Sequence, residues 1–180
     1  MRLEGKLIEK RAMGGKMVIF RYITLSDSRG LSNLVNSLVK EKANIGTTKH
    51  VTEKKQRKIL KTFLKTMGEE GITIVADSGV YAGSCTLRRG KKIFSQTADL
   101  GVFLLKKYRK MGIGKRLMEL AMGEAKRIWN VRIVKLEVFK NNGNAIKTYK
   151  RLGFKKYGEI QREALHWGKY KDVVYMHKRL

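Results

Sequence analysis

The sequence contains no proline, one cysteine and three histidines, and it has 15 acidic residues against 41 lysines and arginines. The single cysteine, Cys85, excludes a disulfide bond within the chain and is expected to be a small residue of a strand. It lies at no zinc-ligand spacing from the histidines at positions 50, 166 and 177, so no metal site is predicted. The absence of proline points to no particular function.

Long hydrophobic runs are also missing. No uninterrupted apolar segment approaches the length of a membrane span, and the first residues are rich in charge instead of forming the apolar core of a signal peptide. The chain has 180 residues, of which 42% are hydrophobic, and this suits one domain with its own core. We therefore predict a single soluble domain over residues 1–180, in the cytoplasm and without membrane contact. The oligomeric state stays open.

The shortage of acidic residues leaves a formal net charge of +26. Such a field attracts polyanions and repels free polyamines. Residues 52–67 illustrate the pattern, because Ile59, Phe63 and Met67 form a predicted apolar stripe among six basic residues. Those residues are either a solvated lysine-rich helix face or a surface for nonspecific contact with nucleic acid or ribosomes.

Apolar periodicity and turn residues predict a mixed α/β domain. A Gly14-Gly15 turn between two β-prone runs indicates an N-terminal β-hairpin within residues 1–24. Asp27 then precedes a helix with an apolar stripe. The other expected helices cover residues 52–67, 116–128 and 145–152, and the expected strands after the hairpin cover residues 72–76, 80–88, 93–105, 133–139, 159–167 and 173–178.

The segment from Tyr108 to Lys115 has the character of a phosphate loop. It connects a β-prone run to a predicted helix, where the first backbone N–H groups lack partners and the helix dipole favours an anion. Its two glycines carry no Cβ atom that would hold a phosphate away. A Walker loop is excluded because Arg116 occupies the position that requires a serine or threonine hydroxyl. A dinucleotide-binding fingerprint is excluded because Leu117 occupies the position of its third glycine. For this segment alone, the alternative is an ordinary glycine-containing loop that happens to carry basic residues.

A second segment, from Asn142 to Phe154, narrows the interpretation. Together the two segments resemble the GCN5-related N-acetyltransferase (GNAT) superfamily. The R/Q-x-x-G-x-G/A motif is matched by Arg109, Gly112 and Gly114, and the later N-x-x-A-x-x-x-Y-x-x-x-G-F motif by Asn142, Ala145, Tyr149, Gly153 and Phe154. The resemblance extends over almost the whole chain, and residues 18–27, 36–43 and 168–176 look like archaeal-type members.

The resemblance implies a mixed, mostly antiparallel central sheet flanked by helices, in which two neighbouring strands splay apart near a bulge. It also implies binding of acetyl-CoA, with the pantetheine arm taking the place of the missing strand partner. The residues implied to bind the cofactor are Val102, Phe103 and Leu104 for the pantetheine, Arg109, Lys110, Met111, Gly112, Ile113, Gly114 and Lys115 for the pyrophosphate, and Asn142 and Tyr149 near the CoA arm. As an alternative, Asn142 is simply the N-cap of its helix.

The implied reaction is transfer of an acetyl group to a primary amine by direct attack in a ternary complex, without a metal. Tyr149 matches the tyrosine that protonates the leaving thiolate, although an aromatic residue on a short helix also suits packing. Asp99 and Glu41 are candidates for the general base, and the alternative for each, which is the default for a lone carboxylate, is a surface residue without a part in the reaction. The acceptor is expected to be a protein or peptide amine, or a small amine that is not strongly cationic. The alternative function is a CoA-binding GNAT-fold protein that acts mainly as a nucleic-acid- or ribosome-associated module.

Overall fold

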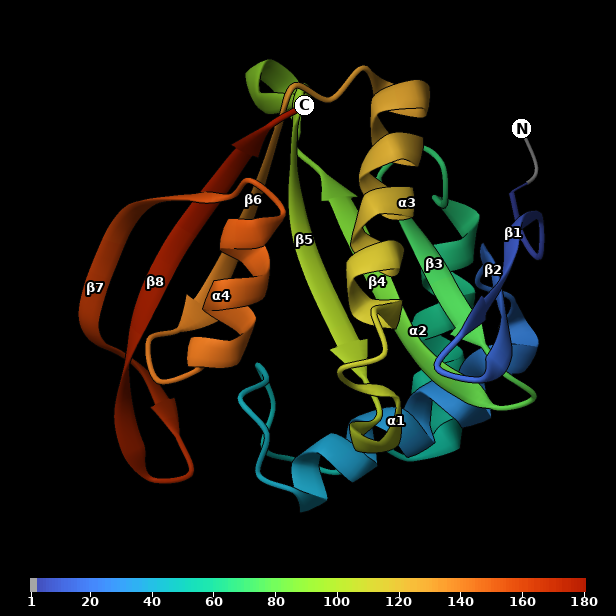
Figure 1. Cartoon of the computed structure of the whole chain (residues 1–180), viewed down its shortest axis with the longest axis horizontal. Helices are drawn as coiled ribbons and strands as arrows, with labels where there is room; N and C mark the ends of the chain where they lie inside the picture. Colours follow the sequence, from blue (N-terminus) through green and yellow to red (C-terminus); the bar gives the residue numbers. More distant parts are fainter. Residues whose placement is uncertain (1–2) are drawn as a thin grey trace.

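The computed structural model describes residues 3–180 and contains an eight-stranded sheet in the order β1-β2-β3-β4-β5-β6-β8-β7 (Figure 1). Every neighbouring pair is antiparallel except β5 and β6, which are parallel. The predicted mixed, mostly antiparallel sheet is therefore confirmed. Residues 1–2 of the expected hairpin lie outside the described residues. The strands are β1 (Leu7–Met13), β2 (Lys16–Tyr22), β3 (Gly71–Asp77), β4 (Tyr81–Arg89), β5 (Thr97–Leu104), β6 (Ile133–Phe139), β7 (Lys155–His166) and β8 (Lys169–Arg179).

Four helices cover the two faces of this sheet: α1 (Ser28–Lys40), α2 (Glu53–Lys65), α3 (Ile113–Trp129) and α4 (Gly143–Arg151) (Figure 1). Alternate residues of β3 separate the core into two parts, as the period of two in a strand requires. Ile72 and Ile74 belong to the larger cluster, beneath α3 and α4, whereas Val75 belongs to the smaller cluster with α1 and α2. The central strands are thus buried on both faces.

The buried face of α2 differs from the predicted one. Leu60 is 3% exposed and packs inward with Phe63, whereas Ile59 is 51% exposed. The packed face of α2 follows the spacing i, i+3 and i+4 from Leu60 through Phe63 to Leu64, so two leucines face the core in place of Ile59. The predicted stripe was wrong by one residue at its start.

The strand predicted over residues 93–105 is also shorter than expected. Residues 92–94 form a 3₁₀ turn, and β5 begins only at Thr97. The chain folds tightly around Gly90, where an added Cβ would lie 2.3 Å from the carbonyl oxygen of Phe94. This turn leaves Ile93 89% exposed, so its apolar character did not indicate a buried strand.

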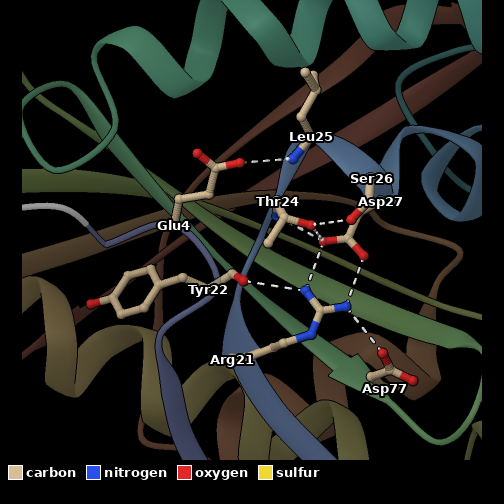
Figure 2. A network of polar contacts seen from close by, with 8 residues as sticks. All are labelled: Glu4, Arg21, Tyr22, Thr24, Leu25, Ser26, Asp27 and Asp77. Carbon is tan, nitrogen blue, oxygen red and sulfur yellow. Dashed lines mark hydrogen bonds and ion pairs between the residues drawn. The ribbon is translucent and has the colours of Figure 1, made fainter.

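An ion-pair network fixes the start of α1 against the sheet (Figure 2). Arg21 of β2 donates two hydrogen bonds of 2.8 Å to the carboxylate of Asp27 and one of 3.0 Å to Asp77 of β3. Asp27 also accepts a hydrogen bond of 2.7 Å from the backbone N–H of Thr24. Burial opposes the charged form of Asp27, but the bonds from Arg21 and Thr24 outweigh it and hold the pKa of this carboxyl below its ordinary value. The network orients α1, whose far end reaches the cavity described below.

The sheet opens between β5 and β6. The two strands pair only from Thr97 to Asp99 with Ile133 to Lys135, and beyond these residues they diverge (Figure 1). The register of β4 with β5 is continuous from residue 98 to residue 104, so the bulge expected here is not found in this strand pair. The opening arises instead because β6 stays paired with β8 along its whole length and turns away with it.

Candidate active site

A cavity of about 1330 Å³ occupies the opening between β5 and β6. Its walls are the ends of these two strands, the N-terminus of α3, one side of α4, the segment that follows α1 and part of β7. Successive side chains of β6 lie on opposite faces of the sheet. Val134, Leu136 and Val138 point into the core under α3 and α4, and Glu137 therefore lies on the opposite face, toward α1.

One end of the cavity is built to receive an anion. Gly112 is the N-cap of α3 with φ of 79°, a left-handed conformation that glycine adopts without strain. The N–H groups of residues 113–115 have no backbone or side-chain acceptor within residues 3–180, because the first bond of the helix runs from Arg116 to the carbonyl oxygen of Gly112. Gly114 leaves open space, with the nearest atom to an added Cβ at 3.9 Å. These features fit a diphosphate.

Not every residue predicted for this loop faces the cavity. Arg109, Lys110, Gly112, Gly114 and Lys115 line it. By contrast, Ile113 is 1% exposed and belongs to the core, and Met111 packs over Gly14 of the β1–β2 turn.

The side chain of Arg109 is directed toward Glu41. Its guanidinium forms a bidentate ion pair with that carboxylate, one contact of which measures 3.2 Å, and its Nε atom donates to the carbonyl oxygen of Leu104 at 3.2 Å. Arg109 thus ties the end of β5 to the residue after α1. Glu41 does line the cavity, but its charge is already compensated by this pair.

The predicted pantetheine-binding residues lie along the open edge of β5. Val102, Phe103 and Leu104 all line the cavity, and their partners on the other side are in β4. Beyond Asp99 the edge of β5 that faces β6 has no strand partner among residues 3–180, so the backbone groups on that edge can bind an extended ligand as a further strand would.

Two predicted residues of α4 also reach the cavity. Tyr149 is half-buried between the cavity and the ring of Phe154, with the two ring centroids 5.9 Å apart. Burial raises the pKa of its phenol to about 12. Asn142 lines the cavity and is at the same time the N-cap of α4, since its Oδ1 atom accepts from the N–H of Ala145 at 3.4 Å.

Asp99 does not reach the cavity. It lies where β5 and β6 are still paired, its side chain is 64% exposed, and Lys135 of the neighbouring strand is 3.4 Å from its carboxylate. Two residues further along β6, Glu137 occupies the same face exactly where the strands have separated, and it lines the cavity. Glu137 was not among the residues predicted from the sequence, although the alternation of Lys135 and Glu137 with apolar residues marks the polar face of that strand.

Two kinds of feature are not found among residues 3–180. No group of three or more histidine, cysteine, aspartate or glutamate side chains is arranged to hold a metal ion. No helix of the described part of the chain is long and apolar enough to cross a membrane. Cys85 is buried in β4, as expected.

The comparison with known families agrees with this geometry. The sequence model of the acetyltransferase (GNAT) family matches residues 32–154, which include both the anion cradle and Tyr149. The chain belongs to the GNAT family.

Two curated proteins are similar to parts of this GNAT chain. An N-alpha-acetyltransferase of Sulfurisphaera tokodaii is 41% identical over 56 residues, which cover 31% of this chain and 34% of that protein. The L-amino acid N-acetyltransferase AaaT of Escherichia coli K12 is 33% identical over 82 residues, which cover 46% of this chain and 51% of that protein. The GNAT chain thus spans between a third and about half of the length of these relatives.

Solved structures resemble the GNAT chain over nearly its full length. A ribosomal-protein-alanine N-acetyltransferase from Brucella melitensis has a TM-score of 0.81 at 22% identity, with 89% of this chain and 99% of that chain covered. RimL, a ribosomal L7/L12 alpha-N-protein acetyltransferase in complex with coenzyme A, has a TM-score of 0.83 at 16% identity, with 97% and 98% covered. At such identities the likeness shows the fold alone.

Proposed function

We propose that this protein is an N-acetyltransferase that uses acetyl-CoA to acetylate a primary amine by direct attack in a ternary complex. One observation carries the proposal. The opening between β5 and β6 joins an anion cradle on one side of the sheet to a carboxylate, Glu137, on the other, with Tyr149 bordering it. A thioester donor and an amine acceptor can thus meet from opposite faces.

We assign the donor to the side of α3 and α4. The N–H groups at the start of α3 would bind the diphosphate, with Lys110 and Lys115 adding positive charge. The free edge of β5 at residues 102–104 would bind the pantetheine arm, and Asn142 would border it. Acetyl-CoA supplies the activated acetyl group and a thiolate leaving group.

We assign the proton transfers to two residues of the cavity. Tyr149 is the acid, because a phenol whose pKa is raised to about 12 stays protonated at neutral pH and donates its proton to a thiolate. Glu137 is the carboxylate that receives the proton of the attacking amine. Glu41 is held by Arg109 and Asp99 lies outside the cavity, so we retain Glu41 as a residue that orders the cavity wall and give Asp99 no part in the reaction.

The acceptor is proposed to be the amine of a protein, a peptide or a small molecule. The names of the relatives include acetyltransferases of protein N-termini and of L-amino acids, and these two classes define the substrates to be compared. Location in the cytoplasm, a single domain over residues 1–180 and the archaeal-type subgroup stay predictions.

The test is a steady-state assay of the purified chain with acetyl-CoA and matched amines. We expect release of free CoA that depends on the amine, and an acetylated amine detectable by mass spectrometry. Replacement of Glu137 by glutamine should lower kcat about 10²- to 10⁴-fold, as is typical for the loss of a general base, while acetyl-CoA binding is retained. A protein that binds acetyl-CoA but acetylates no amine would favour the binding module instead.

We propose a second property for α2, which is salt-sensitive binding of nucleic acid. The helix carries six basic residues, none of which forms an ion pair with an acidic side chain of residues 3–180: Lys54, Lys55, Arg57, Lys58, Lys61 and Lys65. Uncompensated charge on one helix suits contact with a phosphate backbone, and such contact depends steeply on salt and little on sequence.

A further inference from the structure

The lining of the cavity changes sign from one end to the other. The basic residues of the cofactor end include Lys110 and Lys115 together with Lys147 of α4, and the carboxylate of Glu41 there is paired with Arg109. At the other end, Glu137 of β6 and Glu163 of β7 line the cavity. A chain with a net charge of +26 thus keeps two of its 15 acidic residues at the end where the acceptor would enter.

Neither of these carboxylates is neutralised by a basic side chain within residues 3–180. Other acidic residues nearby are paired with basic side chains. Glu41 in the same cavity is paired with Arg109, and Glu159 on the same strand as Glu163 binds both Lys140 and Lys156. Glu137 and Glu163 are therefore the carboxylates of this cavity that are available to bind a cation supplied by a ligand.

An irregularity of β7 places Glu163 in the cavity. The register with β8 passes from Ile160↔Val173 to Ala164↔Lys171, so residues 161–163 form a bulge opposite Asp172. The N–H of Arg162 donates to the carboxylate of Asp172 at 3.0 Å, and the guanidinium of Arg162 stacks over the ring of Tyr170, with 4.9 Å between its central carbon and the ring centroid. The basic side chain beside Glu163 is therefore engaged elsewhere.

Tyr175 links the two carboxylates. It is the cross-strand partner of Glu137, and its hydroxyl donates a hydrogen bond to Glu163. That hydrogen bond, together with burial and the negative charge of Glu163 and Glu137, raises the pKa of the Tyr175 phenol to about 12. The phenol thus remains a donor, and it orients Glu163 while leaving lone pairs of the carboxylate free for a ligand.

We infer that the acceptor is a peptide amine with a basic side chain beside it, and that Glu163 binds this second positive charge. The inference rests on the proposed acetyltransferase activity and specifies the acceptor. The local charge of the acceptor end, and not the net charge of the protein, decides the preference, because these two carboxylates border the space that the acceptor would enter, whereas the surface lysines act from a greater distance through solvent that screens them. The surface field still repels small free polyamines during approach, and this favours the peptide.

The inference is tested with three tripeptides that begin with alanine and carry lysine, alanine or glutamate at the second position. For the wild-type chain we expect kcat/KM to be about tenfold higher for the lysine peptide than for the alanine peptide, mainly through KM, and lowest for the glutamate peptide. A tenfold preference corresponds to about 1.4 kcal/mol. A free diamine, assayed in parallel, should be a poorer substrate than the lysine peptide.

Matched variants separate a specific role from a structural one. Glu163→Gln should reduce the preference for lysine over alanine to about one, and Glu163→Lys should make the glutamate peptide the best substrate of the three. Glu159→Gln removes a paired carboxylate from the same strand and should keep the wild-type order of substrates. A structural defect would lower all three rates by the same factor and leave the order unchanged.

Two results would overturn the inference while leaving the proposed function intact. One is equal acetylation of the three peptides by the wild-type chain, and the other is an unchanged order of substrates in Glu163→Lys. If no amine of any kind is acetylated although acetyl-CoA binds, the proposed function itself fails, and the two failures are thereby distinguished.

Discussion

Replacement of Gly114 by valine should separate cofactor binding from folding. The residue lies in the first turn of α3 with an ordinary helical conformation, and the nearest atom to an added Cβ, the Cδ2 atom of Leu104, is 3.9 Å away. Glycine is about 1 kcal/mol poorer than alanine inside a helix, and valine recovers part of this difference. We therefore expect the free energy of unfolding to change by less than about 1 kcal/mol.

The effect on the cofactor should be much larger. A Cβ atom on a helix tilts toward the N-terminus of the helix, which is where the diphosphate is proposed to lie. Loss of one hydrogen bond from a backbone N–H to a charged phosphate costs about 1.5–3 kcal/mol, which corresponds to a roughly 10- to 150-fold weaker binding of CoA. Isothermal titration calorimetry measures the affinity, and thermal melting without ligand measures the stability.

Gly112→Val is the matched comparison, because it disturbs both properties. Gly112 has a φ of 79°, and a residue with a Cβ atom at this position lowers the free energy of unfolding by about 1–2 kcal/mol. For a domain of this size each kcal/mol lowers Tm by roughly 2–4 °C, so a clear loss of stability should accompany the loss of affinity. If Gly114→Val melts like the wild type and binds CoA with unchanged affinity, the diphosphate does not bind at the start of α3.

Three further predictions concern other parts of the molecule. Tyr149→Phe should lower kcat about 10²- to 10⁴-fold with little change in acetyl-CoA affinity. Because the pKa of this phenol is raised to about 12, the single-turnover rate of the wild type should not fall through deprotonation of Tyr149 up to about pH 10. Equal rates for the wild type and Tyr149→Phe would make Tyr149 a packing residue. Asp27→Asn should lower the free energy of unfolding in urea at pH 7 by about 3–5 kcal/mol, as expected for a broken buried ion pair. The pKa of Asp27 is lowered in the folded protein, so the stabilisation by its charged carboxylate is complete above about pH 4 and is lost as the pH falls through the folded pKa. The stabilities of the two proteins should therefore converge at low pH. A difference that stays constant with pH would show that the ion pair is not its cause. Charge reversal at Lys54, Lys55 and Lys58 should weaken RNA binding at low salt without changing acetyl transfer to a neutral peptide, and an equal loss of both activities would place α2 at the acceptor site.

Local sequence determined the elements of the cofactor end. The phosphate loop and the α4 segment lie within short stretches, where glycine spacing, an N-cap and a helical apolar face act over a few residues. For this reason the position of Tyr149 on α4 and the strand–loop–helix order around Gly112 could be read directly, and β6 begins and ends at the predicted residues. Local patterns were insufficient where packing against another element selects the buried residues. In α2, packing buries Leu60 and leaves Ile59 exposed.

The acceptor end was decided only by the tertiary structure. Glu137 and Glu163 are 26 positions apart, on strands that are not neighbours in the sheet. Glu137 reaches the cavity because β6 and β8 turn away from β5, and Glu163 reaches it because the bulge in β7 changes the direction of its side chain. Asp99 and Glu137 are chemically alike in the sequence, yet one lies where the strands are paired and the other where they have separated. The pairing of Glu41 with Arg109 likewise joins residues 68 positions apart. Sequence specifies which residues are available for chemistry, whereas strand divergence, a long-range property of the sheet, decides which of them face the same space.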